Sequence, residues 1–208
     1  SGYPEHTDLI FSVIDRNLEV RASDGVFNAI VPGWIPTFKP ALANVYQPKL
    51  VDIENETWYA SRKLDGVRCL AIIDAAGKVE LRSRQGQVFE TLDKVVNDIE
   101  ALNLINTVLD GEICICDDLD NEDFQAIMKE IRRKDHTIQN PKFKIFDCIS
   151  KDTFDNEVGS ERLERRLRTA SSIVDSSDGD TLQYVEHFSL IDDAHFEKWQ
   201  DMARDNNW

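Results

Sequence analysis

The sequence that decides the fold is residues 57–84, which read TWYASRKLDGVRCLAIIDAAGKVELRSR. Three short runs in this stretch are rich in β-branched, aromatic and other apolar residues. The pairs Asp65-Gly66 and Ala76-Gly77 separate these runs, and such pairs between strand-like runs are typical of tight turns. The stretch therefore predicts three antiparallel strands joined by tight turns.

The flanking sequence extends this pattern into a mixed fold. Apolar residues recur at helical spacing in residues 91–104, 121–134, 160–174 and 192–204, with Asn121 as the expected N-cap of the second helix. Apolar runs at residues 107–116 and 142–149 predict two further strands. The irregular alternation of strands and helices favours an α+β fold, with antiparallel β-sheets flanked by helices, over a doubly wound parallel sheet.

The composition indicates a globular protein with an acidic surface. The 208 residues include 39 Asp or Glu and 24 Lys or Arg, which gives a formal net charge of −15. This average argues against a uniformly basic nucleic-acid surface but is compatible with a local basic cleft. No apolar run approaches the ~18–20 residues of a membrane span, and the first residues do not form a signal peptide. We therefore expect a cytoplasmic protein.

Two segments are expected along the chain. Three prolines lie in residues 31–40, VPGWIPTFKP, which predicts an irregular connection. Residues 1–37 are accordingly expected to be an N-terminal extension or an irregular segment. Residues 38–208 are expected to form the main domain.

Cysteine and histidine spacing offers no metal site. The cysteines lie in strand-like runs without Cys-x-x-Cys spacing, which favours buried reduced thiols; they are Cys69, Cys114, Cys116 and Cys148. The histidines are scattered without metal-ligand spacing; they are His6, His136, His187 and His195. We therefore assign no metal ligand to this chain.

The chemistry concentrates in residues 63–68, KLDGVR. Lys63 is expected at a strand end beside a turn, and its cationic neighbours Arg62 and Arg68 should lower its pKa. A lowered pKa favours the neutral amine that a lysine nucleophile requires. The competing interpretation of this motif alone is a hairpin turn flanked by solvated basic residues.

The spacing Lys-x-Asp-Gly-x-Arg in residues 63–68 resembles the active-site motif of covalent nucleotidyltransferases, namely ATP-dependent DNA ligases, RNA ligases and mRNA capping enzymes. The next three motifs of that family resemble, in the family order, residues 83–86 (SRQG), 109–112 (LDGE) and 143–147 (FKIFD). Segments typical of DNA ligases resemble residues 38–43 (FKPALA) and 123–128 (DFQAIM). The chain is thus similar to the adenylation domain of ATP-dependent DNA ligases, and the resemblance implies their ATP-grasp-like nucleotidyltransferase fold.

The resemblance also implies a role for each motif residue. Lys63 would attack the α-phosphate of ATP, with Mg²⁺ as the metal cofactor, and the AMP of the resulting lysyl-AMP would pass to the 5′-phosphate of nicked double-stranded DNA. Phosphoryl transfer depends mainly on positioning and charge neutralisation, which suits arginines and Mg²⁺. The implied contacts are Arg68 with the ribose or phosphate, Glu112 with the ribose, Phe146 with adenine and Arg84 with the nick 5′-phosphate. Asp65 fits the motif, and its role is open.

Several of these residues also have a purely structural interpretation. Glu112 could be an exposed turn acid, and Phe146 could be a buried core residue. Alternation along residues 79–84 places Arg82 and Arg84 on one polar strand face, which is either solvated or an anion site. The helix that contains Arg162, Arg165, Arg166 and Arg168 is expected to present a solvated face rather than a DNA contact, because Glu161 and Glu164 are interleaved.

Two motifs of the family do not occur in the sequence. No Glu-Gly dipeptide is present, and the Lys-x-Lys pair Lys142 and Lys144 lies upstream of the family position. We therefore expect an incomplete adenylation domain that continues beyond Trp208, in a monomeric protein of a bacterial or phage-infected cell. The enzymatic alternatives are an RNA ligase or a GTP-dependent mRNA capping enzyme. The non-enzymatic alternative is a catalytically silent module that binds nucleic acid or a protein partner.

Overall fold

The computed structural model describes residues 24–31, 40–206 and 208. The chain divides into two compact units, Ser1–Phe38 and Lys39–Trp208. In the first unit the described residues contain one short helix, α2 (Asp24–Ile30). The irregular connection predicted for residues 31–40 lies almost entirely outside the described residues.

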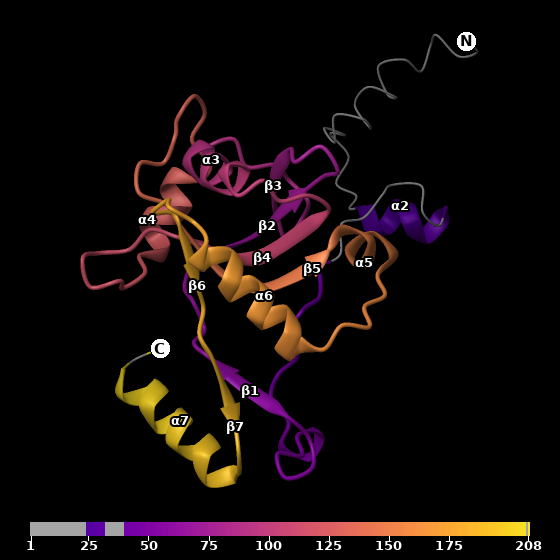
Figure 1. Cartoon of the computed structure of the whole chain (residues 1–208), viewed down its shortest axis with the longest axis vertical. Helices are drawn as coiled ribbons and strands as arrows, with labels where there is room; N and C mark the ends of the chain where they lie inside the picture. Colours follow the sequence, from indigo (N-terminus) through magenta and orange to yellow (C-terminus); the bar gives the residue numbers. More distant parts are fainter. Residues whose placement is uncertain (1–23, 32–39, 207) are drawn as a thin grey trace. The chain divides into compact units, whose positions relative to one another are not determined.

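The second unit is built on a five-stranded sheet (Figure 1). Its strands, in the spatial order β3-β2-β4-β5-β6, are β2 (Val67–Ile73), β3 (Val79–Ser83), β4 (Thr107–Cys114), β5 (Lys142–Ser150) and β6 (Leu182–Tyr184). Neighbouring strands are antiparallel, except that β5 and β6 are parallel. The predicted α+β fold with antiparallel sheet is confirmed.

One of the two predicted turns closes a hairpin. Strands β2 and β3 pair directly, and Gly77 between them has a φ of 81°, a conformation that favours glycine. The Asp74 carboxylate closes the turn by accepting hydrogen bonds from the backbone N–H groups of Ala76 and Lys78, at 2.8 and 2.9 Å. The turn predicted at Ala76-Gly77 is therefore confirmed.

The turn predicted at Asp65-Gly66 is wrong. Strand β1 (Trp58–Ser61) does not pair with β2 but forms a separate two-stranded sheet with β7 (His187–Leu190). A Cβ on Gly66 would lie 2.5 Å from the carbonyl oxygen of Ile113, so this glycine permits close approach to β4 and does not turn a hairpin. The partner β7 is far away in sequence and four residues long, which is why local patterns do not reveal it.

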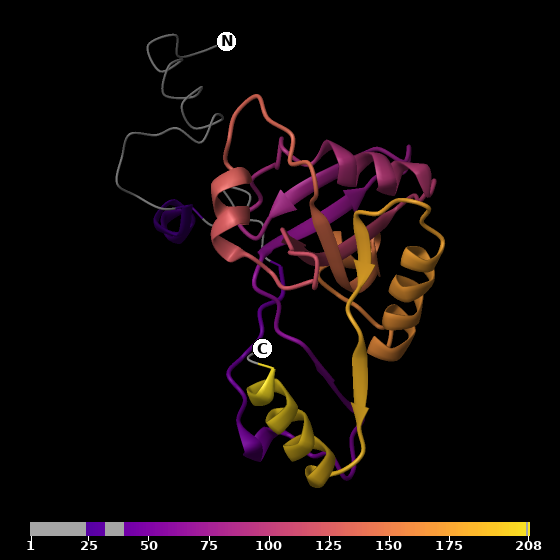
Figure 2. The same ribbon diagram turned by 90° about the vertical axis from the view of Figure 1, so that its left-hand side faces the viewer.

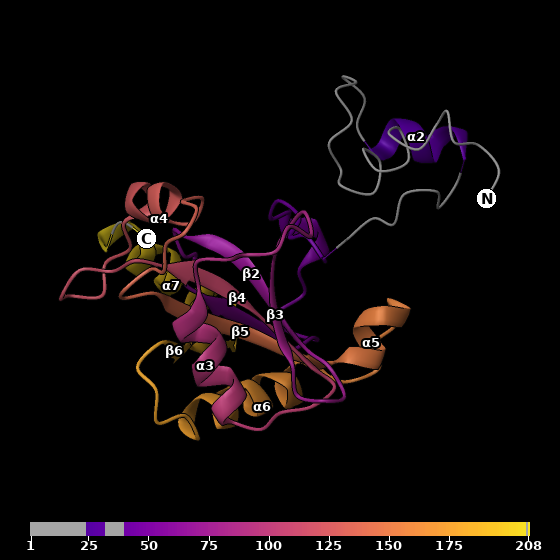
Figure 3. The ribbon, with the colours of Figure 1, turned by 90° about the horizontal axis from the view of Figure 1, so that it is seen from above.

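The main core lies on one face of the five-stranded sheet, where α3 (Asp93–Ala101) and α6 (Leu163–Asp175) are placed (Figure 3). Both helices are amphipathic, as predicted. Fully or nearly fully buried helix residues include Val95 and Ile99 of α3 and Leu167 and Ala170 of α6. Alternate strand residues complete the cluster, among them Cys69, Ile113 and Phe143.

The remaining helices fit the prediction with two differences. The helix predicted near residues 121–134 is α4 (Phe124–Glu130), but its N-cap is Asp123, which accepts a hydrogen bond from the N–H of Ala126, and not Asn121. The Asn121 side chain instead donates to the Asp117 carboxylate and stabilises the preceding loop. A further helix, α5 (Lys151–Asn156), follows β5 directly and was not predicted from the sequence.

The two-stranded sheet has its own small packing layer. Helix α7 (Asp193–Asp205), predicted from its apolar spacing, lies beside β7 (Figure 2). Its Trp199 ring lies 4.2 Å from the ring of Phe188, and its Phe196 ring lies 5.1 Å from that of Tyr46, next to the short 3-10 helix η2 (Pro48–Leu50). No residue of α7 is fully buried, so this layer is more exposed than the main core.

The four cysteines are free thiols. Cys69, Cys114 and Cys148 are buried and Cys116 is partly buried, so the prediction of buried reduced thiols is confirmed for three of them. In the part of the chain that the structure describes, no helix combines the length and apolar character needed to cross a bilayer.

Candidate active site

The polar face of the five-stranded sheet, opposite the main core, carries three of the predicted site residues, namely Arg68, Glu112 and Phe146. Side chains alternate between the two faces of a strand. On β4, Leu109 and Ile113 belong to the core cluster, whereas Asp110 and Glu112 occupy the alternate positions. On β2, Arg68 lies directly opposite Glu112 in the antiparallel register.

A β-bulge redirects β5 at the site. Asp110 pairs with Asp147 and Gly111 pairs with Ile145, which leaves Phe146 as the extra residue on β5. Phe146 is therefore partly buried and packs against a second, smaller cluster formed by Leu64, Cys114 and Val185. Phe146 is therefore a strand residue that borders this smaller cluster, and it does not belong to the main core.

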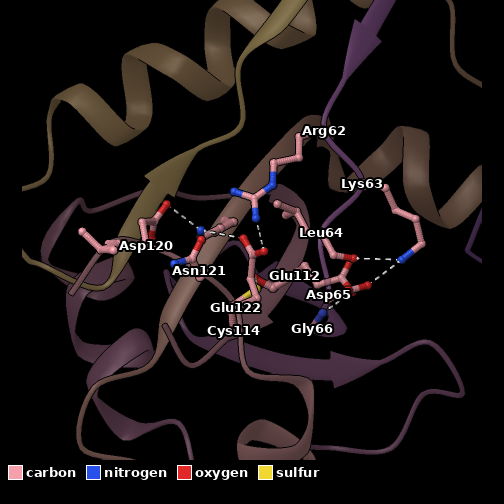
Figure 4. A network of polar contacts seen from close by, with 12 residues as sticks. Arg62, Lys63, Leu64, Asp65, Gly66, Glu112, Cys114, Asp120, Asn121 and Glu122 are labelled. Atoms are coloured by element: carbon pink, nitrogen blue, oxygen red, sulfur yellow. Dashed lines mark hydrogen bonds and ion pairs between the residues drawn. The ribbon is translucent and has the colours of Figure 1, made fainter. Parts of the chain in front are cut away.

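Residues 62–66 lie between β1 and β2 and carry the lysine of the motif (Figure 4). Leu64 is buried in the smaller cluster, and the N–H of Gly66 donates a hydrogen bond of 3.1 Å to the Glu112 Oε1. Contacts on its C-terminal side thus hold the backbone around Lys63 against β4. The Lys63 side chain itself points outward and is 82% exposed.

The Lys63 ammonium is stabilised in its charged form. Its Nζ donates to Asp65 Oδ1 at 2.8 Å and to the Leu64 carbonyl oxygen at 3.2 Å. The hydrogen bond to Asp65 raises the pKa of Lys63 above its ordinary value, and the carboxylates of Glu112 and Glu122 act in the same direction. The expectation of a lowered pKa is wrong because the hydrogen bond to Asp65 and the charges of these carboxylates outweigh the lowering effect of partial burial.

Arg68 is held by three hydrogen bonds. Its Nε and Nη2 donate to the two carboxylate oxygens of Asp110, at 3.0 and 2.6 Å, and its Nη1 donates to the carbonyl oxygen of Ala41 at 2.6 Å. The guanidinium carbon lies 5.8 Å from the centroid of the Phe146 ring. Such a bidentate pair fixes both the position and the plane of the guanidinium.

Glu112 is a partly buried residue inside β4. Burial raises the pKa of its carboxyl group, against the opposing effects of the Gly66 N–H and of Lys63. The interpretation of Glu112 as an exposed turn acid is therefore wrong. Three contacts bring the four site residues into one region. Gly66, near Lys63, donates to Glu112; Leu64, next to Lys63, belongs to the cluster that Phe146 packs against; and Arg68 lies over the Phe146 ring.

Among the described residues, Arg84 forms no hydrogen bond or ion pair with this group. Strand β3 ends at Ser83, and the chain turns so that the Gly86 N–H donates to the Ser83 carbonyl oxygen at 2.8 Å. Arg84 is therefore an exposed turn residue, and the prediction that it shares a strand face with Arg82 is wrong. Arg82 pairs with Glu80, whereas Arg84 has no ion pair or hydrogen bond within the described residues.

The arginines of α6 are neutralised by acidic neighbours. Arg165 pairs with Glu161, and Arg168 pairs with Glu164. Arg166 instead reaches β5, where its Nε and Nη2 donate to the Asp147 carboxylate at 2.9 and 3.1 Å. The exposed pairs of Arg165 and Arg168 agree with the predicted solvated helix face, whereas Arg166 packs against the sheet.

Sequence reasoning missed a charged network beside the lysine segment. Arg62 pairs with Glu122 (Figure 4). The Oε1 of Glu122 also accepts a hydrogen bond of 2.9 Å from the Nζ of Lys144. Asp120 accepts a second hydrogen bond of 2.8 Å from the same Nζ. The Lys-x-Lys spacing at residues 142–144 was the one local signal that pointed to Lys144.

The described residues offer little for direct metal binding. Within residues 24–31, 40–206 and 208, no group of three or more His, Cys, Asp or Glu side chains is arranged to hold a metal ion. The site also contains the cationic side chains of Lys63 and Arg68, and side chains of this kind recognise anionic groups.

The fold is shared with solved ligase structures, among them an ATP-dependent DNA ligase. The chain belongs to the family described as the ATP-dependent DNA ligase domain, whose profile matches residues 40–208.

Individual relatives agree with this assignment. The DNA ligase of Enterobacteria phage T4 is 29% identical over 123 residues, which cover 54% of this chain and 25% of the phage protein. A solved structure named Pmar-Lig_Pre has a TM-score of 0.68 at 22% identity, covering 93% of this chain and 46% of that one. The ATP complex of the bacteriophage T7 ligase has a TM-score of 0.53 at 14% identity, covering 68% of this chain and 51% of that one. The chain thus spans about half of the solved structures and a quarter of the curated relatives.

Proposed function

We propose that residues 38–208 form the adenylation domain of an ATP-dependent DNA ligase, with residues 1–37 as an N-terminal extension, and that Lys63 is its nucleophile. The observation that carries this proposal is the geometry of the lysine segment. The Lys63 amine is exposed, while contacts of Leu64 and Gly66 hold the adjoining backbone. A nucleophile held in this way combines access to a ligand with restricted motion.

The proposed reaction is phosphoryl transfer to the lysine side chain. The Lys63 ammonium first releases a proton to solvent, and the freed lone pair of Nζ attacks the α-phosphorus of ATP. A P–N bond forms, the bond between the α-phosphorus and the bridging oxygen breaks, and pyrophosphate leaves with the electron pair. The attacking nitrogen then releases a second proton to solvent, and the product is a lysyl-AMP phosphoramidate.

The residues around Lys63 fit an adenine nucleotide. The Phe146 ring supplies a face for stacking of the base, and the Glu112 carboxylate can accept hydrogen bonds from ribose hydroxyls. Arg68, fixed by Asp110, supplies a positive charge beside Phe146. Mg²⁺, when bound with the nucleotide, would neutralise phosphate charge, and it characteristically relies on substrate phosphates more than on protein ligands.

The second proposed step transfers AMP to the 5′-phosphate of nicked double-stranded DNA, after which the 3′-hydroxyl displaces AMP and seals the strand. Arg84 supports this step because it is exposed on a turn and has no partner among the described residues. We propose a monomeric, cytoplasmic protein. The match to the DNA ligase domain disfavours an RNA ligase, a capping enzyme and a catalytically silent module.

Intact-mass measurement tests the first step. After incubation with Mg²⁺ and ATP, we expect an AMP adduct on the wild-type chain and none on Lys63→Ala. Lys78→Ala, which removes another exposed lysine, is the matched control and should still form the adduct. An adduct from GTP alone would support a capping enzyme, and the absence of any adduct on the wild-type chain would refute adenylation by residues 1–208.

A further inference from the structure

The charged network beside Lys63 is almost completely buried on its sheet side. The side chains of Glu122 and Lys144 are 4% and 5% exposed, and that of Arg62 is 27% exposed. Buried charges are found in proteins when they are paired, since isolated ones carry a large desolvation penalty. Here the two cations share Glu122, and Asp120 supplies the second carboxylate at the more exposed end.

The network connects three segments that are distant in sequence. Arg62 directly precedes the proposed nucleophile, Glu122 follows the loop at residues 117–121, and Lys144 lies on β5 two positions before Phe146. Figure 4 shows the Arg62 and Lys63 side chains pointing in different directions, with Arg62 directed toward Glu122. Lys144 and Phe146 share the polar face of the sheet, so the network adjoins the proposed base site.

The position of Glu122 is itself well determined. Residue 122 forms an isolated antiparallel bridge with Cys116, and the Asp117 side chain closes the intervening loop by accepting from the N–H of Asn121 at 2.9 Å. The Lys144 hydrogen bond fixes the orientation of the Glu122 carboxylate. Both the backbone and the carboxylate of Glu122 are therefore held in place, and Arg62 pairs with this fixed carboxylate.

Stability alone does not account for this arrangement. Replacement of a buried ion pair by apolar residues of similar volume is often neutral or stabilising, because the desolvation penalty disappears together with the attraction. One donor of Arg62, its Nε, is in addition buried without an acceptor among the described residues, which is a further cost. Charged hydrogen-bonding groups are needed for a directional contact that fixes the position of a neighbouring residue. Apolar packing could stabilise this region without them.

We infer that Arg62, Glu122 and Lys144 form a positioning clamp that holds the N-terminal side of the Lys63 segment against the sheet, while Leu64 and Gly66 hold its C-terminal side. The effect of the clamp on catalysis rests on the proposed adenylation activity. Its three residues are positioning residues, since they act on the nucleophile through the backbone. Loss of the clamp should misplace Nζ relative to the α-phosphate, and misplacement of this kind can lower a rate by about 10–100-fold.

Backbone hydrogen exchange and single-turnover adenylation together test the clamp. In Glu122→Gln we expect exchange of the peptide covering residues 62–67 to accelerate by about tenfold, with exchange in β4 unchanged. The rate of adenylate formation at saturating ATP should fall by about 10–100-fold, with a smaller change in the KM for ATP. The control is Glu161→Gln, which removes an exposed ion pair with Arg165 and should alter neither quantity.

An apolar triple variant separates positioning from stability. Arg62→Met, Glu122→Leu and Lys144→Met in one chain should recover thermal stability, because no charge is left buried without a partner. Positioning predicts that this stable variant still exchanges rapidly at residues 62–67 and still forms the adenylate slowly. This variant also decides the question if Glu122→Gln does not fold.

Two results would overturn the clamp. One is unchanged protection of residues 62–67 in a folded variant that lacks Glu122, and the other is recovery of both protection and rate in the triple variant. Failure of the proposed function has a different signature, namely a wild-type chain that forms no adduct. Hydrogen exchange can be measured on an inactive protein. If the wild-type chain forms no adduct, exchange alone therefore tests whether the clamp holds residues 62–67.

Discussion

Asp65 accepts a hydrogen bond of 2.8 Å from the Nζ of Lys63, two residues earlier in the same segment. The pair is exposed, with both side chains more than half accessible to solvent. It keeps the lysine in its ammonium form, and this form cannot act as a nucleophile until it loses a proton. The Asp-Gly pair of the motif therefore contributes a carboxylate that governs the protonation of the lysine and a glycine that permits close packing.

The first prediction concerns pH. Because Asp65 raises the pKa of Lys63, the neutral amine is scarce near pH 7, and the rate of adenylate formation should rise with pH until the pH passes that raised pKa. Asp65→Asn removes the carboxylate that is the main cause of the raised Lys63 pKa. The rise of the adenylation rate with pH should therefore occur at lower pH in this variant than in the wild type. Single-turnover adenylation, followed by intact mass across the alkaline range, measures both profiles.

The control for this prediction is Asp155→Asn, which removes a similar exposed carboxylate from its pair with Lys151. Its profile should coincide with that of the wild type. Coincidence of the Asp65→Asn and wild-type profiles would show that Asp65 does not control the protonation of Lys63.

The second prediction concerns Gly66. In Gly66→Ala the new Cβ would lie 2.5 Å from the Ile113 carbonyl oxygen and 2.7 Å from Cys114 Sγ, so the segment must move away from β4. We expect a loss of about 1–3 kcal/mol in the free energy of unfolding, as for other overpacked sites. Adenylate formation by the folded protein should also fall, because the hydrogen bond from Gly66 to Glu112 would be broken.

Gly77→Ala provides the comparison for Gly66. Its positive φ should cost about 1–2 kcal/mol, and it lies in the hairpin turn between β2 and β3. Urea unfolding should therefore show similar destabilisation for the two variants, whereas adenylation per folded molecule should fall only in Gly66→Ala. Equal adenylation rates would contradict the role of Gly66 in placing the lysine segment.

The third prediction separates two phenylalanines of β5. Phe143 is fully buried in the main core, so Phe143→Ala should lower the free energy of unfolding by about 3–5 kcal/mol. Phe146 is the partly buried bulge residue, and Phe146→Ala should destabilise the protein less. Its main effect should be weaker nucleotide binding, by about 1–3 kcal/mol, the value of one base stacked on an aromatic ring.

Calorimetric titration with ATP and urea unfolding measure these two quantities. Unchanged nucleotide affinity in Phe146→Ala would exclude Phe146 as the stacking residue. A stability loss as large as that of Phe143→Ala would show instead that Phe146 serves the core.

The fourth prediction concerns Arg84. Since this residue is exposed on a turn and has no partner among the described residues, Arg84→Ala should change the free energy of unfolding by no more than about 0.5 kcal/mol. Formation of the Lys63 adenylate should be unaffected. Transfer of AMP from the adenylated protein to nicked DNA should slow, because a phosphate contact is lost.

A chase of labelled protein-bound AMP with nicked duplex DNA measures that transfer. Arg133→Ala, which removes an exposed arginine paired with Glu130, should leave transfer unchanged. Unchanged transfer in Arg84→Ala would place the 5′-phosphate contact elsewhere.

Local sequence patterns predicted the elements whose stabilising contacts are close in sequence. The β2–β3 hairpin, the amphipathic helices α3, α6 and α7, and the strands β4 and β5 all appear near their predicted positions. Their hydrophobic period or turn residues are sufficient to define them. The strand β1 was also visible, but its partner β7 was not, because pairing between distant short strands leaves no local period.

By itself, the sequence determined the α+β class. Through the resemblance of its motifs to those of ATP-dependent DNA ligases, it also indicated the lysine, arginine, glutamate and phenylalanine of the candidate site. Only the tertiary structure decided how these residues are used. It paired the Lys63 ammonium with Asp65 and Arg68 with Asp110, placed Phe146 at a β-bulge beside a second buried cluster, and gave Arg62 and Lys144 a shared partner in Glu122. The physical reason is that charge pairing, desolvation and strand register depend on the distances between segments that are remote in sequence. The spacing of residues along the sequence does not contain these distances.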